Sequence, residues 1–129
     1  MTLTITPIYA ALIVLLFLGL SWRVILYRRA NRLSLGDTGD KNLLKRMRAQ
    51  ANCAEYAPLA LLLMVMSELM GSPAVALHLM GLTLLAGRVL HSLGFAATPQ
   101  KIVLRQLGML LTLLMMAVTA LGLLAHAVI

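Results

Sequence analysis

Residues 5–26, ITPIYAALIVLLFLGLSWRVIL, form an apolar run that is long enough to cross a lipid bilayer, because one helical pass takes about 20 apolar residues. We expect Thr6 to cap this helix and Pro7 to occupy its first position, where a missing N–H costs nothing. A cleaved signal peptide has positive charge before its apolar run and a small-residue cleavage site after it. Here the chain opens uncharged and Trp22-Arg23 closes the run, so we interpret it as the first membrane helix.

The composition of the whole chain extends this interpretation. Of the 129 residues, 61% are hydrophobic and 12% are charged, whereas a soluble domain has roughly 45–50% apolar residues. A chain of this length holds about four passes and no separate catalytic domain outside the membrane. One cysteine, Cys53, excludes an internal disulfide, and the three histidines show no metal-ligand spacing, so we expect no metal.

Turn signals divide the chain into four predicted helices. The polar segment 27–40, which ends in a glycine-rich cluster, is the longest predicted loop, and Asp40 is placed to cap the second helix. Pro58 is expected to kink that helix. Ser72 and Pro73 are predicted to cap and open the third helix. The expected fold is therefore all-α, a single domain over residues 1–129 that forms an up-down-up-down bundle of four transmembrane helices, at about 5–26, 40–70, 73–95 and 100–127.

The distribution of positive charge predicts an orientation. All 11 Lys and Arg residues fall on the side of the first and third loops, and the opposite side has none. The positive-inside rule then places both basic loops in the cytoplasm and both termini outside a bacterial inner membrane. This bias argues against a small multidrug-type exporter, which inserts in both orientations. Because the charges lie between apolar segments, we expect membrane lipid rather than nucleic acid as the neighbour of this chain.

Charged residues within the apolar segments are candidates for function. Arg23, Glu55 and Arg88 each lie about 22–24 Å from the outer end of their predicted helix, at a rise of 1.5 Å per residue. Their similar depth predicts ion pairing of Glu55 with one of the arginines. A purely structural pair, formed only to solvate the charges, is the alternative interpretation.

Two helix faces carry most of the reactive side chains. On the second helix, residues at i, i+4, i+7 and i+8 share a face, and they are Arg48, Asn52, Glu55 and Tyr56. On the third helix, a face is shared by Arg88, His91 and Phe95. Guanidinium groups bind carboxylates and a carboxylate binds an ammonium, so the predicted cleft suits glutathione, an acidic amino acid or a lipid headgroup.

Three stretches resemble one known family of membrane proteins. They are RAQANCAEYAP at 48–58, VILYRRA at 24–30 and GRVLHSLGF at 87–95. The chain resembles the MAPEG family, the membrane-associated proteins in eicosanoid and glutathione metabolism. The Gly36-Asp37 loop and the run at 84–88 are closest to a small bacterial branch of that family.

The resemblance implies a homotrimer that binds glutathione between neighbouring subunits near the cytosolic face. It implies that Glu55 receives the γ-glutamyl ammonium and that Arg105 stabilises the thiolate as the catalytic residue. The cofactor-binding residues expected from the faces and the resemblance together are Arg29, Arg48, Asn52, Glu55, Tyr56, Arg88 and His91. Phe95 stands where many members have a tyrosine, so one hydroxyl contact to glutathione is expected to be missing.

Taken with these residues, the resemblance implies a glutathione-dependent enzyme at the membrane surface. It would add the glutathione thiolate to a hydrophobic electrophile or use it to reduce a lipid hydroperoxide. The alternative is a protein of the same fold that binds glutathione or another anion without turnover.

Overall fold

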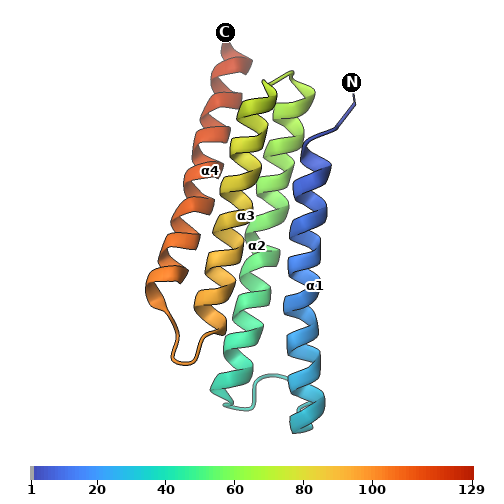
Figure 1. Ribbon diagram of the computed structural model, residues 1–129, viewed down its shortest axis with the longest axis vertical. Coiled ribbons are helices and arrows are strands. Elements are labelled where there is room, and N and C mark those ends of the chain that lie inside the picture. The colour runs from blue at the N-terminus through green and yellow to red at the C-terminus, as the bar shows by residue number, and fades with distance from the viewer. Residues whose placement is uncertain (1) are drawn as a thin grey trace.

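The structure, a computed structural model that describes residues 2–129, contains four long helices within that range (Figure 1). They are α1 (Thr6–Asn31), α2 (Lys41–Leu69), α3 (Ala74–Ala96) and α4 (Ile102–Val128). Successive helices run in opposite directions, so both chain termini lie at one end, together with the α2–α3 turn. We call this the terminal end. The opposite end, which holds the α1–α2 and α3–α4 loops, is called the basic end.

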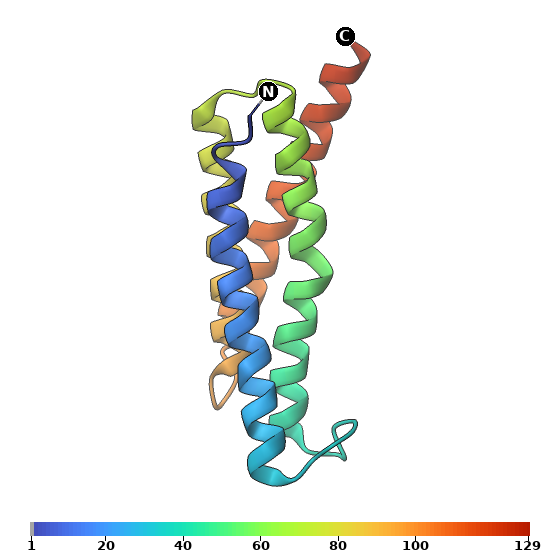
Figure 2. The ribbon, with the colours of Figure 1, turned by 90° about the vertical axis from the view of Figure 1, so that its right-hand side faces the viewer.

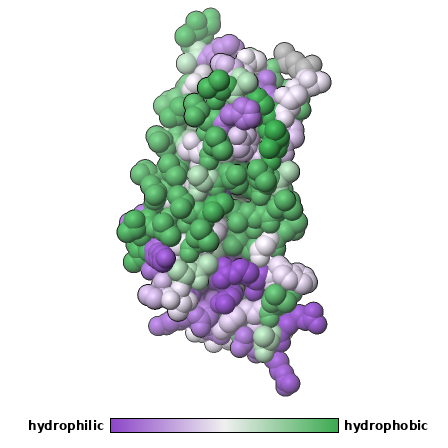
Figure 3. All heavy atoms as spheres, in the orientation of Figure 1, coloured by the Kyte–Doolittle hydropathy of each residue, from purple (hydrophilic) through white to green (hydrophobic). Residues whose placement is uncertain are grey.

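Three of the helices, α1, α3 and α4, are long and apolar enough to cross a membrane. The helix α2 does not qualify, and its first half carries Lys41, Lys45, Arg46 and Arg48. It nevertheless packs against each of the other three helices and so belongs to the same bundle. The face seen in Figure 3 is mostly hydrophobic over its middle, and hydrophilic side chains gather at the basic end. The expected all-helical membrane fold is therefore confirmed, with three apolar spans rather than four.

Helix α1 ends later than the sequence predicted. Residues 27–31, which we assigned to the loop, form its last turns. The prediction took the end of the apolar run for the end of the helix, whereas arginine and alanine are good helix formers. Arg32 ends α1 in the left-handed conformation at φ 55°, and the N–H of Leu33 bonds to the carbonyl of Arg28. The helix thereby extends its arginines beyond the apolar span.

The loop that follows is joined to α2 by Asp40, the predicted N-cap. Its carboxylate accepts hydrogen bonds from the backbone N–H groups of residues 42 and 43, at 2.8 and 3.1 Å, and from the Tyr27 hydroxyl at 2.8 Å. The bond from the Leu43 N–H, followed by that from Tyr27, lowers the pKa of Asp40. The predicted cap is thus confirmed.

The two other predicted caps are wrong, because Ile5 and Pro73 occupy the N-cap positions of α1 and α3 and neither makes a side-chain cap. At α1 the cap comes from a distant residue. The Glu68 carboxylate, at the end of α2, accepts the N–H groups of Thr4, Ile5 and Thr6 at 2.6, 2.8 and 2.7 Å. These donors have no partner inside a helix, so Glu68 fastens the start of α1 to the end of α2.

Glycines let α3 and α4 approach closely in the half of the bundle near the basic end. A Cβ at Gly87 would lie 2.8 Å from the Gly108 carbonyl oxygen, and one at Gly94 would lie 2.6 Å from the backbone nitrogen of Arg105. Small residues of this kind allow helix backbones to touch in membranes. Helix α4 is inclined to the other three (Figure 2). The contact brings the start of α4 over the last turns of α3.

Candidate functional site

The basic end contains a cleft of about 490 Å³ between α2, α3 and α4. This volume is within the range of about 300–1,000 Å³ that is usual for small-molecule sites. We call it the basic-end cleft, and it is lined by Arg48, Asn52, Tyr56, His91, Phe95, Ile102, Arg105, Gln106 and Met109. Five of the eight predicted site residues are therefore brought together here.

Helix α2 contributes Arg48, Asn52 and Tyr56, one helical turn apart on a single face, as the spacing predicted. Glu55 does not line the cleft. Its carboxylate lies 3.7 Å from the Arg48 guanidinium, and both side chains are about half exposed, at 52% and 50%. This is the one salt bridge among residues 2–129, so the predicted pairing of Glu55 with Arg23 or Arg88 is wrong. Arg48 takes the carboxylate because it lies two turns away on the same helix face.

Helix α3 places His91 and Phe95 in the cleft wall with ring centroids 5.0 Å apart. Among residues 2–129, no hydrogen bond occupies the His91 ring, so its nitrogens are free for a ligand. Arg88 shares their helix face but is 1% exposed and does not line the cleft. It lies behind the cleft wall, where its guanidinium donates to Asn52.

Helix α4 supplies Arg105, the predicted thiolate-stabilising residue. Its guanidinium lies 3.8 Å from the centre of the Phe95 ring, and one of its nitrogens donates to the Gln100 side-chain oxygen at 2.6 Å. The close α3–α4 contact at Gly94 sets this position. Arg48 and Arg105 thus give the cleft two guanidinium groups, and no carboxylate is among its lining residues.

Arg29 is not brought to the basic-end cleft. It lines a separate, open pocket of about 450 Å³ that is formed by residues 25–34 of α1 and the following loop. Helix α1 packs against α2 and α3 but makes no contact with α4 among residues 2–129. Within one chain, Arg29 therefore lies apart from the other predicted site residues.

Sequence reasoning missed several residues that shape the site. Ile102, Gln106 and Met109 line the cleft. Gln100 bonds to Arg105, and Thr112 bonds to Arg88 behind the cleft wall. A helical spacing was available as a signal, because Arg105, Met109 and Thr112 recur at i, i+4 and i+7. Only Arg105 was singled out in this segment from the sequence, so this face of α4 was not predicted.

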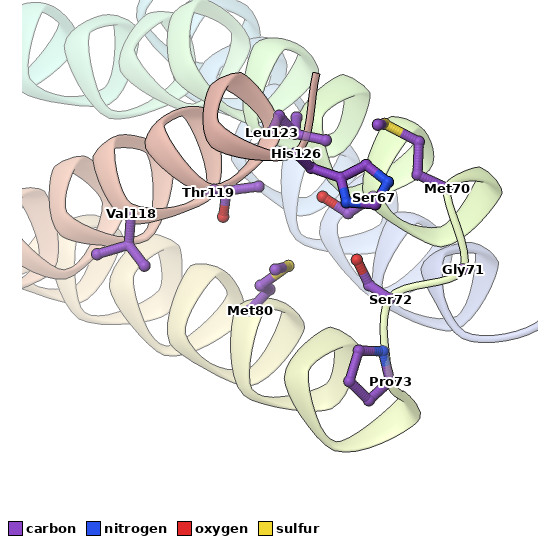
Figure 4. A pocket seen from close by; sticks show the side chains of 11 residues that line it. Ser67, Met70, Gly71, Ser72, Pro73, Met80, Val118, Thr119, Leu123 and His126 are labelled. Atoms are coloured by element: carbon purple, nitrogen blue, oxygen red, sulfur yellow. The ribbon is translucent and has the colours of Figure 1, made fainter. Parts of the chain in front are cut away.

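The terminal end has a second cavity, of about 380 Å³, between α4 and the α2–α3 turn (Figure 4). We call it the terminal-end cavity. Its walls are mostly apolar, and the hydroxyls of Ser67 and Thr119 donate to carbonyls one turn earlier in their own helices, at 2.9 and 2.7 Å. Ser72 and His126 supply the other polar side chains. It offers a ligand no charged group comparable to the two arginines of the basic-end cleft.

Residues 6–125, which include every residue that lines the basic-end cleft, match the MAPEG family model. The chain belongs to the MAPEG family. This MAPEG chain is 36% identical over 91 residues to inner membrane protein YecN of Escherichia coli (strain K12), and the match covers 70% of each chain. The same figures hold for inner membrane protein YecN of Escherichia coli O6:H1 (strain CFT073). The family resemblance inferred from the sequence is thereby confirmed.

Proposed function

We propose that this protein is a glutathione-dependent transferase or peroxidase of the inner membrane, with its basic end in the cytoplasm. The observation that carries the proposal is the convergence of two guanidiniums, an amide, a phenol and an imidazole in one cleft. Guanidiniums and hydrogen-bond donors suit an anionic peptide with two carboxylates. The names of the relatives support the inner membrane, and the positive-inside rule supports the orientation.

Arg105 is the residue that we expect to stabilise the glutathione thiolate. Its guanidinium is held over Phe95 at the cleft wall, and a nearby cation lowers the pKa of a thiol. The thiol proton leaves to water at the basic end. The thiolate then forms an S–C bond with a hydrophobic electrophile while the bond to a leaving group, or the π bond of an activated alkene, breaks. The electron pair leaves with the departing anion or is protonated by water. In the peroxidase case the thiolate breaks the O–O bond of a lipid hydroperoxide, giving an alcohol and a sulfenic acid that a second glutathione converts to the disulfide and water.

The assembly is part of the proposal. We expect a homotrimer in which Arg29 of one subunit reaches the basic-end cleft of its neighbour. Two features support this arrangement: Arg29 lies outside the cleft of its own chain, and α1 makes no contact with α4 among residues 2–129. A neighbouring α1 beside α4 would bring its basic end to the open side of the cleft.

Calorimetric titration of glutathione into the detergent-solubilised protein tests the binding site. We expect saturable binding that is weakened about ten- to a hundredfold in Arg48→Ala, because a charge-assisted hydrogen bond is lost. Lys41→Ala is the matched control, since it removes an exposed charge from the same helix outside the cleft. Absence of binding to the unaltered protein at millimolar glutathione would refute the proposal.

A protein that binds glutathione without turnover is the second candidate, and one contact favours it. Arg105 already bonds to Gln100, so its guanidinium is partly engaged before any ligand arrives. Thiolate absorbance in the ultraviolet after mixing with glutathione separates the two candidates. An enzyme should show the signal, and Arg105→Ala should keep binding but lose it. S-methyl glutathione gives the blank, because its methylated sulfur cannot form a thiolate. A full signal in Arg105→Ala would refute the assigned role.

A further inference from the structure

Arg88 is a buried guanidinium that joins three helices directly behind the basic-end cleft. It is 1% exposed. Its Nε donates to the Thr112 hydroxyl at 3.0 Å, and one Nη donates to both the backbone carbonyl and the side-chain oxygen of Asn52. The other Nη contacts the Met109 sulfur at 3.6 Å. Its bonds therefore go to neutral groups, because the one salt bridge among residues 2–129 joins Arg48 and Glu55.

The bond to Asn52 decides which way its amide points. A guanidinium has only donors, so the Asn52 atom that faces Arg88 must be the amide oxygen. The amide nitrogen is then the atom left for the cleft that Asn52 lines. An asparagine free to rotate could offer a ligand either a donor or an acceptor, whereas this one offers donors alone.

We propose that Arg88 is a positioning residue that fixes Asn52 as a donor-only contact, so that this part of the cleft selects a carboxylate of the ligand. The inference deepens the proposed function and rests on it, because glutathione carries two carboxylates and one ammonium. The positive charge of Arg88 acts in the same direction. Its guanidinium lies behind Asn52, which lines the cleft, and no carboxylate among residues 2–129 pairs with it. A ligand carboxylate in the cleft is therefore attracted and an ammonium is repelled.

The test compares glutathione with two analogues, its glycyl ethyl ester and the tripeptide that lacks the γ-glutamyl carboxylate. Each analogue removes one carboxylate. In the unaltered protein we expect one of them to bind about ten- to a hundredfold more weakly than glutathione because it loses the bond to Asn52. For each analogue we take the ratio of its dissociation constant to that of glutathione. Arg88→Gln should reduce this ratio to near one for the analogue that loses the Asn52 bond, while the ratio for the other analogue stays constant. Arg88→Lys, which like arginine is positively charged and carries donors only, should restore the ratio.

Two variants of Asn52 complete the test and do not depend on whether Arg88→Gln folds. In Asn52→Ala the same ratio of dissociation constants should fall to near one. Asn52→Asp should bind glutathione worse than Asn52→Ala, because the new carboxylate pairs with Arg88 and repels the ligand.

The outcomes separate this inference from the proposed function. A protein that binds glutathione but keeps both ratios in Asn52→Ala or in folded Arg88→Gln would overturn the inference and leave the proposed function standing. No binding of glutathione to the unaltered protein would overturn both. A fall of both ratios together in Arg88→Gln would show a general structural role and also overturn the positioning role.

Discussion

The two ends of the bundle are both hollowed, yet their polar groups serve different purposes. At the terminal end, the hydroxyls of Ser67 and Thr119 bond to their own helices and the Glu68 carboxylate holds the start of α1. At the basic end, Arg48 and His91 line an open cleft. The comparison teaches that polar side chains indicate a ligand site where several charged and hydrogen-bonding groups converge on one open cleft, even when some of them also bond to the fold, as Arg48 does to Glu55.

Packing explains why these polar groups converge at the basic end. The glycines that lie against a neighbouring helix near the cleft, Gly87, Gly94 and Gly108, join α3 to α4. Gly122, in the part of α4 near the terminal end, faces open space, and a Cβ added there would meet no atom within 4 Å. The tight α3–α4 contact fixes the cleft wall, whereas Gly122 takes no part in such a contact.

The largest expected effect comes from filling the glycine contact. Gly108→Ala places a Cβ against the backbone of His91, which cannot rotate away, so we expect a loss of about 1–3 kcal/mol of stability. Glutathione binding should be lost with it. Gly122→Ala is the matched control in the same helix and should be neutral or stabilising by about 0.5–1 kcal/mol. Thermal unfolding in detergent measures both, and equal unfolding temperatures would contradict the comparison.

Two carboxylates test the comparison further: Glu55, which pairs with Arg48, and Glu68 at the terminal end. Glu55→Gln should weaken glutathione binding about tenfold or more, because it removes the carboxylate beside Arg48 that the family resemblance pairs with the ligand ammonium. It should leave stability unchanged, because Glu55 contacts the fold only through a half-exposed salt bridge. Glu68→Gln should leave binding unchanged and lower stability by about 1 kcal/mol through the weakened cap of α1. Calorimetry and thermal unfolding of both variants check this. Unchanged affinity in Glu55→Gln would remove its proposed role.

The smallest expected effect tests whether a neighbouring subunit contributes Arg29 to the basic-end cleft. Arg29→Ala and Arg48→Ala chains, each expected to bind glutathione only weakly alone, should regain full affinity at part of their sites when co-expressed, because a mixed assembly pairs an intact cleft with an intact Arg29. Random mixing restores about a quarter of the sites when each site is shared by two subunits. Titration of the co-purified, differently tagged mixture measures the fraction. A mixture that regains no sites of full affinity would place the whole site within one chain.

The features predicted well from the sequence depend on local spacing. The α2 face was found because residues 48, 52 and 56 recur at one helical turn, and the Asp40 cap because its partners follow within three residues. The features missed depend on how helices rotate against each other. Arg88 bonds to Asn52 rather than Glu55, and Glu68 caps α1 from a position 62 residues along the chain. No local pattern contains that information.

The Glu68 cap also constrains the biosynthesis of the protein. The first N–H groups of α1 leave the ribosome well before their acceptor, since Thr6 precedes Glu68 by 62 residues. At a translation rate of about 5–20 residues per second, Glu68 is synthesised about 3–12 s after Thr6. During that interval water or lipid headgroups must satisfy the first turn of α1. The arrival of the second helix therefore locks a segment that was translated long before it.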